Sequence, residues 1–273
     1  MNATVLGSRG FIGSHCVTHL KQLGVNVFAP RRDDPSIFSN DLGHVFYCVG
    51  LTADFRQQPV ATIKAHVSYL VDVLEQAKYE SLLYLSSTRV YTGSTCAREE
   101  ETLRVNPGDP SDLYNLSKLT GEAACFVFKN KNVRVARLSN VYGIGMDSVN
   151  FLGSLVDDAV TRGRIMLATS RAGAKDYVCV SDVVKILSKI AFSGRHSLYN
   201  IASGRNVSTE QIVNELARLT GCTIEVAENA PTLVFPEIQT DRIREEFAFT
   251  PKPLIPMLES LVKDRRKGTG VHH

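Results

Sequence analysis

A short apolar strand, a glycine-rich turn and a helix follow one another at the start of the chain. Residues 4–6 form the expected strand, and the turn carries glycines at Gly7, Gly10 and Gly13. Glycine permits a tight strand-to-helix turn, lets the backbone approach a pyrophosphate, and lets the helix sit close to the sheet. Backbone N–H groups at the start of the helix can then receive the phosphates. This spacing in this context predicts a dinucleotide-binding fold.

Strands and helices alternate along the first half of the chain. We expect strands at residues 25–29, 45–49, 82–85 and 133–137, and helices at residues 10–23, 59–78 and 112–129. Uniformly apolar strands separated by helices indicate a parallel sheet covered on both faces. The residues between the second and third strands are too few for another strand with its own crossover. We therefore predict an α/β fold with a Rossmann-type doubly wound parallel sheet, in which one strand, between Arg31 and His44, is missing or reduced.

The pattern loosens after residue 140 and predicts a smaller C-terminal α/β lobe that packs on the first domain. We expect helices at residues 149–162, 208–219 and 253–262, and strands at residues 177–180 and 198–201. The expected division assigns residues 1–140, with 177–192 returning to them, to the dinucleotide-binding domain, residues 141–176 and 193–265 to a substrate-binding lobe, and residues 266–273 to a flexible tail.

Charge and composition argue against several classes of protein. The net charge of +3 is too small to indicate a nucleic acid or an anionic membrane as partner. No apolar run approaches the roughly 18 residues of a membrane-spanning helix, and the chain opens on the first strand without a secretory signal. The six cysteines are scattered and show no metal-ligand spacing. We expect a cytoplasmic protein with reduced thiols, no metal, and neither a nucleic acid nor a membrane as partner.

A tyrosine and a lysine, Tyr114 and Lys118, lie four residues apart in the expected helix 112–129. This spacing places both side chains on one helix face. A nearby ammonium stabilises a phenolate and lowers the pKa of the tyrosine, so the pair can move a proton to or from a substrate hydroxyl. Hydroxyl residues also follow the strand at 82–85, at the sheet edge that faces the ligand crevice, where a hydroxyl can polarise a carbonyl.

With these motifs the chain resembles an extended short-chain dehydrogenase/reductase of the NAD-dependent epimerase/dehydratase family. The matching segments are the glycine turn with Phe11 and Ile12, residues 86–91, Tyr114 with Lys118, and residues 137–143, 176–178, 182–184 and 199–204. They cover almost the whole chain in order. The resemblance implies hydride transfer between a nicotinamide cofactor and a sugar or nucleotide-sugar carbon. It also implies a homodimer formed through the helices at residues 59–78 and 112–129.

The resemblance implies catalytic roles for three residues: Ser87, Tyr114 as acid/base, and Lys118, which also binds the nicotinamide ribose. The expected cofactor-binding residues are Gly7, Arg9, Gly10, Phe11, Ile12, Gly13, Arg31, Val49, Gly50, Leu51, Tyr114, Lys118, Leu138 and Ser139. The expected substrate-binding residues are Thr88, Arg89, Asn140, Lys175 and Arg56.

Several positions depart from the family pattern. His66 stands where the family usually has asparagine, and is either a substitute for it or an ordinary helix histidine. Lys175 replaces an arginine that clamps a diphosphate, and no basic residue occurs in residues 231–240. Whether the substrate carries a nucleotide diphosphate is therefore open. Thr88 and Arg89 replace the acidic pair of sugar 4,6-dehydratases, which argues against elimination of water.

The end of the second expected strand favours one cofactor over the other. Arg31 and Arg32 follow it, and no carboxylate occurs before Asp33. A carboxylate would bind the ribose hydroxyls of NAD, whereas arginine binds the additional phosphate of NADP. Arg9, inside the glycine turn, points the same way. We therefore expect NADP(H), with NAD(H) as the alternative.

The direction and outcome of the reaction stay open, because an epimerase, a reductase and a dehydrogenase share the same hydride step. A second class of function is a non-catalytic dinucleotide-binding sensor or scaffold of the same superfamily. The presence of Ser87, Tyr114 and Lys118 weighs against it, since a sensor has no need of them.

Overall fold

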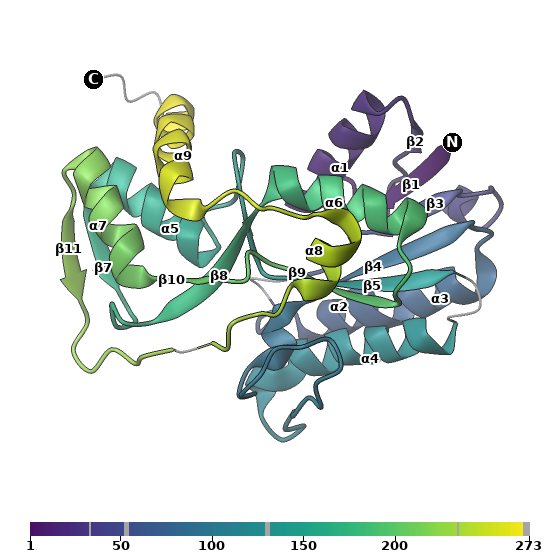
Figure 1. Ribbon diagram of the computed structural model, residues 1–273, viewed down its shortest axis with the longest axis horizontal. Coiled ribbons are helices and arrows are strands. Elements are labelled where there is room, and N and C mark those ends of the chain that lie inside the picture. The colour runs from purple at the N-terminus through teal and green to yellow at the C-terminus, as the bar shows by residue number, and fades with distance from the viewer. Residues whose placement is uncertain (33, 52–54, 129–131, 234, 270–273) are drawn as a thin grey trace.

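Figure 1 shows the computed structural model, which describes residues 1–32, 34–51, 55–128, 132–233 and 235–269. The larger part of the molecule is a twisted sheet between two layers of helices, and a smaller lobe packs beside it. In the described part of the chain no helix is both long and apolar enough to span a bilayer.

The central sheet has six parallel strands in the order β2-β1-β3-β4-β5-β9. They are β1 (Asn2–Leu6), β2 (Asn26–Phe28), β3 (His44–Tyr47), β4 (Ser81–Ser87), β5 (Val133–Leu138) and β9 (Leu198–Ile201). All four side chains of β3 are buried, as expected for a strand covered on both faces. The predicted Rossmann-type parallel sheet is confirmed.

Each face of the sheet is covered by helices (Figure 1). One face carries α1 (Phe11–Gln22) and α6 (Val180–Ser193). The other carries α4 (Leu113–Val127) and a long helix made of α2 (Pro59–Ile63), the π-helical turn η2 (Lys64–Ser68) and α3 (Tyr69–Gln76). The helix expected at residues 59–78 is therefore present, but a wider turn interrupts it.

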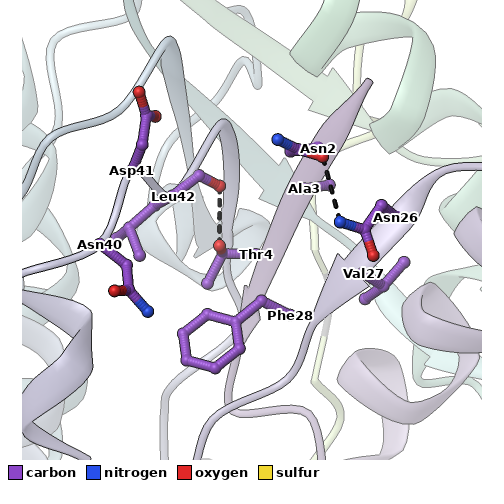
Figure 2. Close-up of a pocket in the computed structure, with 9 residues that line it drawn as sticks. All are labelled: Asn2, Ala3, Thr4, Asn26, Val27, Phe28, Asn40, Asp41 and Leu42. Atoms are coloured by element: carbon purple, nitrogen blue, oxygen red, sulfur yellow. Dashed lines mark hydrogen bonds between the residues drawn. The ribbon is translucent and has the colours of Figure 1, made fainter.

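The connection from β2 to β3 contains no regular strand in its described residues, as predicted. It forms the 3₁₀ turn η1 (Pro35–Ile37), capped by the side chain of Asp34, and one isolated bridge between Asp41 and Lys78. The short connection leaves an open hollow of about 440 Å³ between β1, β2 and residues 40–42, shown in Figure 2. The hollow is lined in β1 only by residues 2–4, and none of its lining residues belongs to the glycine turn.

The smaller lobe contains helices and two small sheets around its own core. Its helices are α5 (Phe151–Asp157) with the π turn η6 (Asp158–Arg162), α7 (Thr209–Thr220) and α9 (Leu254–Thr269). Its sheets are β10 (Asn206–Ser208) with β8 (Ala174–Cys179) and β6 (Asn140–Tyr142), and β11 (Thr223–Val226) with β7 (Arg164–Leu167). A further helix, α8 (Asp241–Phe247), packs beside β9.

Three segments lie elsewhere than the expected division of the chain placed them. β9 pairs with β5 in the central sheet, although residues 193–265 were expected in the second lobe. β8 pairs with β6 and β10, so only α6 of residues 177–192 covers the central sheet. Helix α9 continues to Thr269, so residues 266–269 are helical and not a flexible tail. The division into two domains itself stays a prediction.

Candidate active site

The glycine turn joins β1 to α1 at the carboxyl edge of the sheet. Gly7 has a φ of +80°, and a Cβ there would lie 2.7 Å from the backbone carbonyl of Cys48. A Cβ on Gly13 would lie 2.2 Å from the carbonyl oxygen of Gly7. Gly10 is the N-cap of α1 and has no side chain that could occupy the first N–H groups of the helix. The turn therefore requires glycine at two positions and presents the helix N-terminus, which suits a pyrophosphate.

Tyr114 and Lys118 lie on the face of α4 that packs on the sheet, and both are buried. The Lys118 Nζ donates a hydrogen bond of 2.8 Å to the carbonyl of Leu85, near the end of β4, and lies 6.0 Å from the centre of the Tyr114 ring. Burial lowers the pKa of Lys118 to about 7, against the opposing charge of Glu122. The spacing of four residues thus places a phenol and an amine on one face of α4 at the sheet edge.

His66 connects the turn after β3 to helix α4. The Leu51 N–H donates to Nε2 of His66 at 3.2 Å, so Nε2 is an acceptor and Nδ1 carries the proton. Nδ1 then donates to Oγ of Ser117 at 2.8 Å, and this hydroxyl donates to the carbonyl of Tyr114. Burial, together with the charge of Lys118, lowers the pKa of His66 to about 3. His66 is therefore a neutral ring with a partner on each nitrogen.

Tyrosine hydroxyls from the sheet bond to the π-helical turn around His66. Its wider geometry leaves carbonyls of the helix without their usual partners, and two tyrosine hydroxyls from the sheet donate to them. Tyr47 donates to the carbonyl of Ala65 at 2.7 Å, and Tyr84 to that of His66 at 3.4 Å. Helix α4 comes close at Gly121, where a Cβ would lie 2.7 Å from the carbonyl oxygen of His66. The turn is thereby held between the sheet and α4.

The two serines at the end of β4 point in different directions. Ser86 is buried and donates to the carboxylate of Glu122, which also forms a buried ion pair of 2.7 Å with Arg137. Ser87 is half-buried, and its Oγ accepts the Arg89 N–H at 3.2 Å as the cap of the 3₁₀ turn η3 (Thr88–Tyr91). No described residue accepts the hydroxyl proton of Ser87, which can therefore be donated to a ligand, whereas that of Ser86 is bonded to Glu122.

Aromatic rings and cations gather beside Tyr114. The buried ring of Phe55 lies 5.5 Å from the Tyr114 ring. The guanidinium of Arg89 lies 4.9 Å from the centre of the Phe55 ring and 5.3 Å from that of Tyr114. Arg56 lies 4.6 Å from the Phe55 ring, and the ammonium of Lys175 lies 4.5 Å from the ring of Phe151. Arg56 and Arg89, two of the predicted substrate residues, thus come from separate segments to the region of the tyrosine, whereas Lys175 lies against Phe151 of the smaller lobe.

The other predicted residues lie at or near the same edge of the sheet. Leu138 and Ser139 are buried at the end of β5, and the Oγ of Ser139 has no hydrogen-bond partner among the described residues. Thr88 is buried in η3. The side chain of Asn140 donates to the backbone of Asp176 at 2.8 Å, so the amide is engaged with β8.

The remaining predicted cofactor residues follow the neighbouring strands β1, β2 and β3. Arg9 and Arg31 are exposed after β1 and β2, Phe11 and Ile12 open α1, and Val49, Gly50 and Leu51 form the turn after β3. A Cβ on Gly50 would lie 3.1 Å from Nε2 of His66 and 3.5 Å from Nζ of Lys118. The glycine cradle and the unpartnered Ser139 hydroxyl fit a dinucleotide at this edge. In the described part of the chain no group of His, Cys, Asp or Glu residues is placed to hold a metal ion.

Sequence reasoning did not find every residue that shapes this site. Ser117 was missed, although it is hydrogen-bonded to His66, and so was Phe151 beneath Lys175. Ser117 lies three residues after Tyr114 on the buried face of α4, and this spacing is the sequence feature that could have indicated it. Phe151 carries no comparable signal, because its contact joins α5 to β8.

Known proteins resemble this chain along most of its length. Residues 3–202 match the model of the NAD dependent epimerase/dehydratase family. UDP-glucuronic acid decarboxylase 4 of Arabidopsis thaliana is 25% identical over 230 aligned positions, which cover 72% of this chain and 52% of that protein. The chain thus spans about half the length of that relative.

Two further proteins match the chain over nearly its whole length. A dTDP-4-dehydro-6-deoxy-D-allose reductase of a Streptomyces species is 23% identical, over 95% of this chain and 94% of that protein. The solved structure of MoeE5 in complex with UDP-glucuronic acid and NAD has a TM-score of 0.81 and 25% identity, over 98% of this chain and 100% of that one. The architecture is therefore shared along both parts of the molecule.

Proposed function

The chain belongs to the NAD dependent epimerase/dehydratase family, and from that premise we propose that it transfers a hydride between a nicotinamide cofactor and a carbon of a nucleotide sugar. The observation that carries the proposal is the pairing of Tyr114 and Lys118, buried at the carboxyl edge of the sheet, where a Cβ on Gly50 in the turn after β3 would lie 3.5 Å from Nζ of Lys118. The reductase relative that spans nearly the whole chain and the MoeE5 complex support a nucleotide sugar as substrate.

Residues of three strand ends hold the cofactor in this proposal. Gly7, Gly10 and Gly13 let the start of α1 bind the pyrophosphate, and the buried Ser139 hydroxyl donates to the nicotinamide end. Arg9 and Arg31 bind the additional phosphate of NADP(H), since both are exposed after adjacent strands. NADP(H) is thus the proposed cofactor, with NAD(H) as the alternative.

Tyr114 moves the proton in this proposal. When bound, the nicotinamide supplies or accepts the hydride. In the reducing direction Tyr114 gives its phenolic proton to the substrate oxygen, and Ser87 donates a hydrogen bond that stabilises the developing alkoxide. Lys118 stabilises the phenolate that remains, through its positive charge. In the oxidising direction the phenolate removes the hydroxyl proton.

His66 supports this pair without touching the reacting atoms. Its ring holds the Leu51 N–H on one side and Ser117 on the other. The turn after β3 and helix α4 are therefore kept in register, and Gly50 stays close to the amine of Lys118. We place His66 as a positioning residue in the role for which the family pattern has asparagine.

We also propose a homodimer formed through α2, α3 and α4. Val60, Ile63 and Val127 lie on these helices and are 64%, 42% and 78% exposed. Apolar side chains on neighbouring exposed helices favour burial against a second copy, as in a four-helix bundle.

A direct assay tests the proposed activity. The purified protein is titrated with NADPH and NADH, and then mixed with UDP-glucose, UDP-glucuronic acid or a dTDP-4-dehydro-6-deoxy sugar. A reductase consumes NADPH in proportion to the product, whereas an epimerase converts one sugar into another without net change in nicotinamide absorbance. Saturable cofactor binding without turnover of any sugar would instead favour a non-catalytic sensor or scaffold.

A further inference from the structure

Two arginines near Tyr114 lie on aromatic rings, and among the described residues neither forms an ion pair with a carboxylate. Arg89 stacks over both Phe55 and Tyr114, and Arg56 lies over the same Phe55 ring, 4.6 Å from its centre. Among the described residues, the Arg89 guanidinium donates a long hydrogen bond of 3.5 Å to the carbonyl of Ser111. Ring faces attract a cation but do not neutralise it. The guanidinium thus keeps donors for a further acceptor.

The charges of this cluster, which we define as Arg56, Arg89 and Lys175, repel one another. Burial and then the charge of Arg56 lower the pKa of Arg89, and burial and then the charge of Arg89 lower the pKa of Lys175. The carboxylate of Asp112 opposes this effect on Arg89. Its oxygens, however, already accept the Asn106 N–H at 2.8 Å and the amide of Asn115 at 3.2 Å. An anion that enters the cluster would relieve the repulsion.

Resting on the function proposed above, we infer that the cationic cluster binds a carboxylate carried by the reacting sugar, so that the substrate class is a nucleotide-linked uronic acid. Arg89 stacks on the ring that bears the reacting phenol, so an anion it binds lies close to the carbon that exchanges the hydride. The planar guanidinium fork matches a carboxylate in a bidentate manner.

The location of the cluster separates it from the pyrophosphate site of the cofactor. Arg89 comes from η3 after β4, Arg56 from the segment after β3, and Lys175 from β8, which leads from the smaller lobe into α6 (Figure 1). The glycine turn instead follows β1 and opens α1. Binding of the sugar carboxylate therefore draws on both parts of the molecule and does not compete with the cofactor.

Two probes that differ at one carbon test this inference. UDP-glucuronic acid and UDP-glucose share the nucleotide and diphosphate, but only the first carries a carboxylate on C6. Their affinities for the NADP(H)-loaded protein are measured by calorimetry for the wild type, Arg89→Gln and Arg56→Gln. The matched control is Arg164→Gln, which removes the same charge from an exposed arginine of β7 in the smaller lobe.

We expect the wild type to bind UDP-glucuronic acid about tenfold or more tighter than UDP-glucose, the scale of a hydrogen bond to a charged group. Arg89→Gln removes this preference and changes the affinity for UDP-glucose by less than about threefold. Arg56→Gln reduces the preference for UDP-glucuronic acid, and because the Arg56 side chain is exposed, this variant affects the stability of the fold less. Arg164→Gln leaves both affinities unchanged.

The failures are distinguishable. Equal binding of the two sugars by the wild type overturns the uronic acid inference and leaves the nucleotide-sugar function standing. Equal loss of both sugars in Arg89→Gln also overturns it, because the cluster then binds the diphosphate. Binding of the cofactor but of neither nucleotide sugar overturns the proposed function, and the inference falls with it.

Discussion

Nδ1 of His66 lies 2.8 Å from Oγ of Ser117, the residue that precedes Lys118 on helix α4. The opposite nitrogen of the same ring accepts the Leu51 N–H from the turn after β3. One imidazole thus joins the segment expected to contact the cofactor to the helix that carries the proposed catalytic pair. His66 is the position where the family pattern has asparagine. Comparing leucine and asparagine at this position therefore separates a positioning role from a packing role.

His66→Leu should weaken cofactor binding about tenfold, because the Leu51 N–H loses its acceptor and the turn loses its tie to α4. The buried N–H and the Ser117 hydroxyl left without partners should also cost about 1–3 kcal/mol of unfolding free energy each. His66→Asn keeps an acceptor and a donor and should recover most of both losses. Titration with cofactor and denaturant unfolding measure the two effects. Equal cofactor affinity in both variants would reduce His66 to a packing residue.

The lowered pKa of His66 predicts a specific acid sensitivity. The unfolded chain protonates this ring near pH 6.5 and the folded protein only near pH 3, so the unfolded state binds more protons between these values. The contribution to stability is complete above about pH 6.5 and is lost as the pH falls toward 3, with a slope of at most about 1.4 kcal/mol per pH unit. His66→Asn should flatten the pH dependence of the denaturation midpoint in this window.

Tyr114→Phe should lower turnover about a hundredfold or more, since it removes the proton donor and keeps the ring and its contacts with Phe55 and Arg89. Cofactor affinity should change little. Lys118→Met should lower both turnover and cofactor affinity, whereas Ser87→Ala should mainly lower turnover. Tyr79→Phe, which removes a hydroxyl with only a 3.4 Å bond to a backbone carbonyl, is the matched control. Near-normal turnover of the true substrate by Tyr114→Phe would exclude the tyrosine mechanism.

Arg31→Asp should weaken NADP(H) binding about tenfold or more, because it removes a charge-assisted contact and adds repulsion toward the additional phosphate. NAD(H) should bind equally well or better. Direct titration of both cofactors by fluorescence measures the ratio, and Arg164→Asp supplies the same change of charge on the smaller lobe as a control. If the wild-type protein prefers NAD(H), the roles proposed for Arg9 and Arg31 are wrong.

Val127→Glu should convert the proposed homodimer into a monomer, because it places a charge at the most exposed apolar side chain of α4. Met166→Glu, on the exposed side of β7, should leave the dimer intact. Light scattering at micromolar concentration distinguishes the two states. A wild-type monomer under those conditions would exclude the interface.

Local patterns along the chain were enough to predict most of the dinucleotide-binding half. Gly7, Gly10 and Gly13 act within one turn, and the alternation of apolar strands with helices is a property of neighbouring residues. The short connection between Arg31 and His44 predicted by its length that a strand is missing or reduced, and its described residues contain no regular strand. Tyr114 and Lys118 were paired by helix periodicity.

Contacts between distant segments could not be derived in the same way. The pairing of β9 with β5, the hydrogen bond from Tyr47 to the π-helical turn around His66, and the stacking of Arg89 on Tyr114 each join residues far apart in the chain. The partner of each was chosen by packing, which depends on the assembled fold and not on local spacing. The residue types and periodicities thus specified the sheet, the glycine turn and the tyrosine–lysine pair. Only tertiary packing decided that His66 would bond to both Leu51 and Ser117 and that Arg89 would lie on the ring of Tyr114.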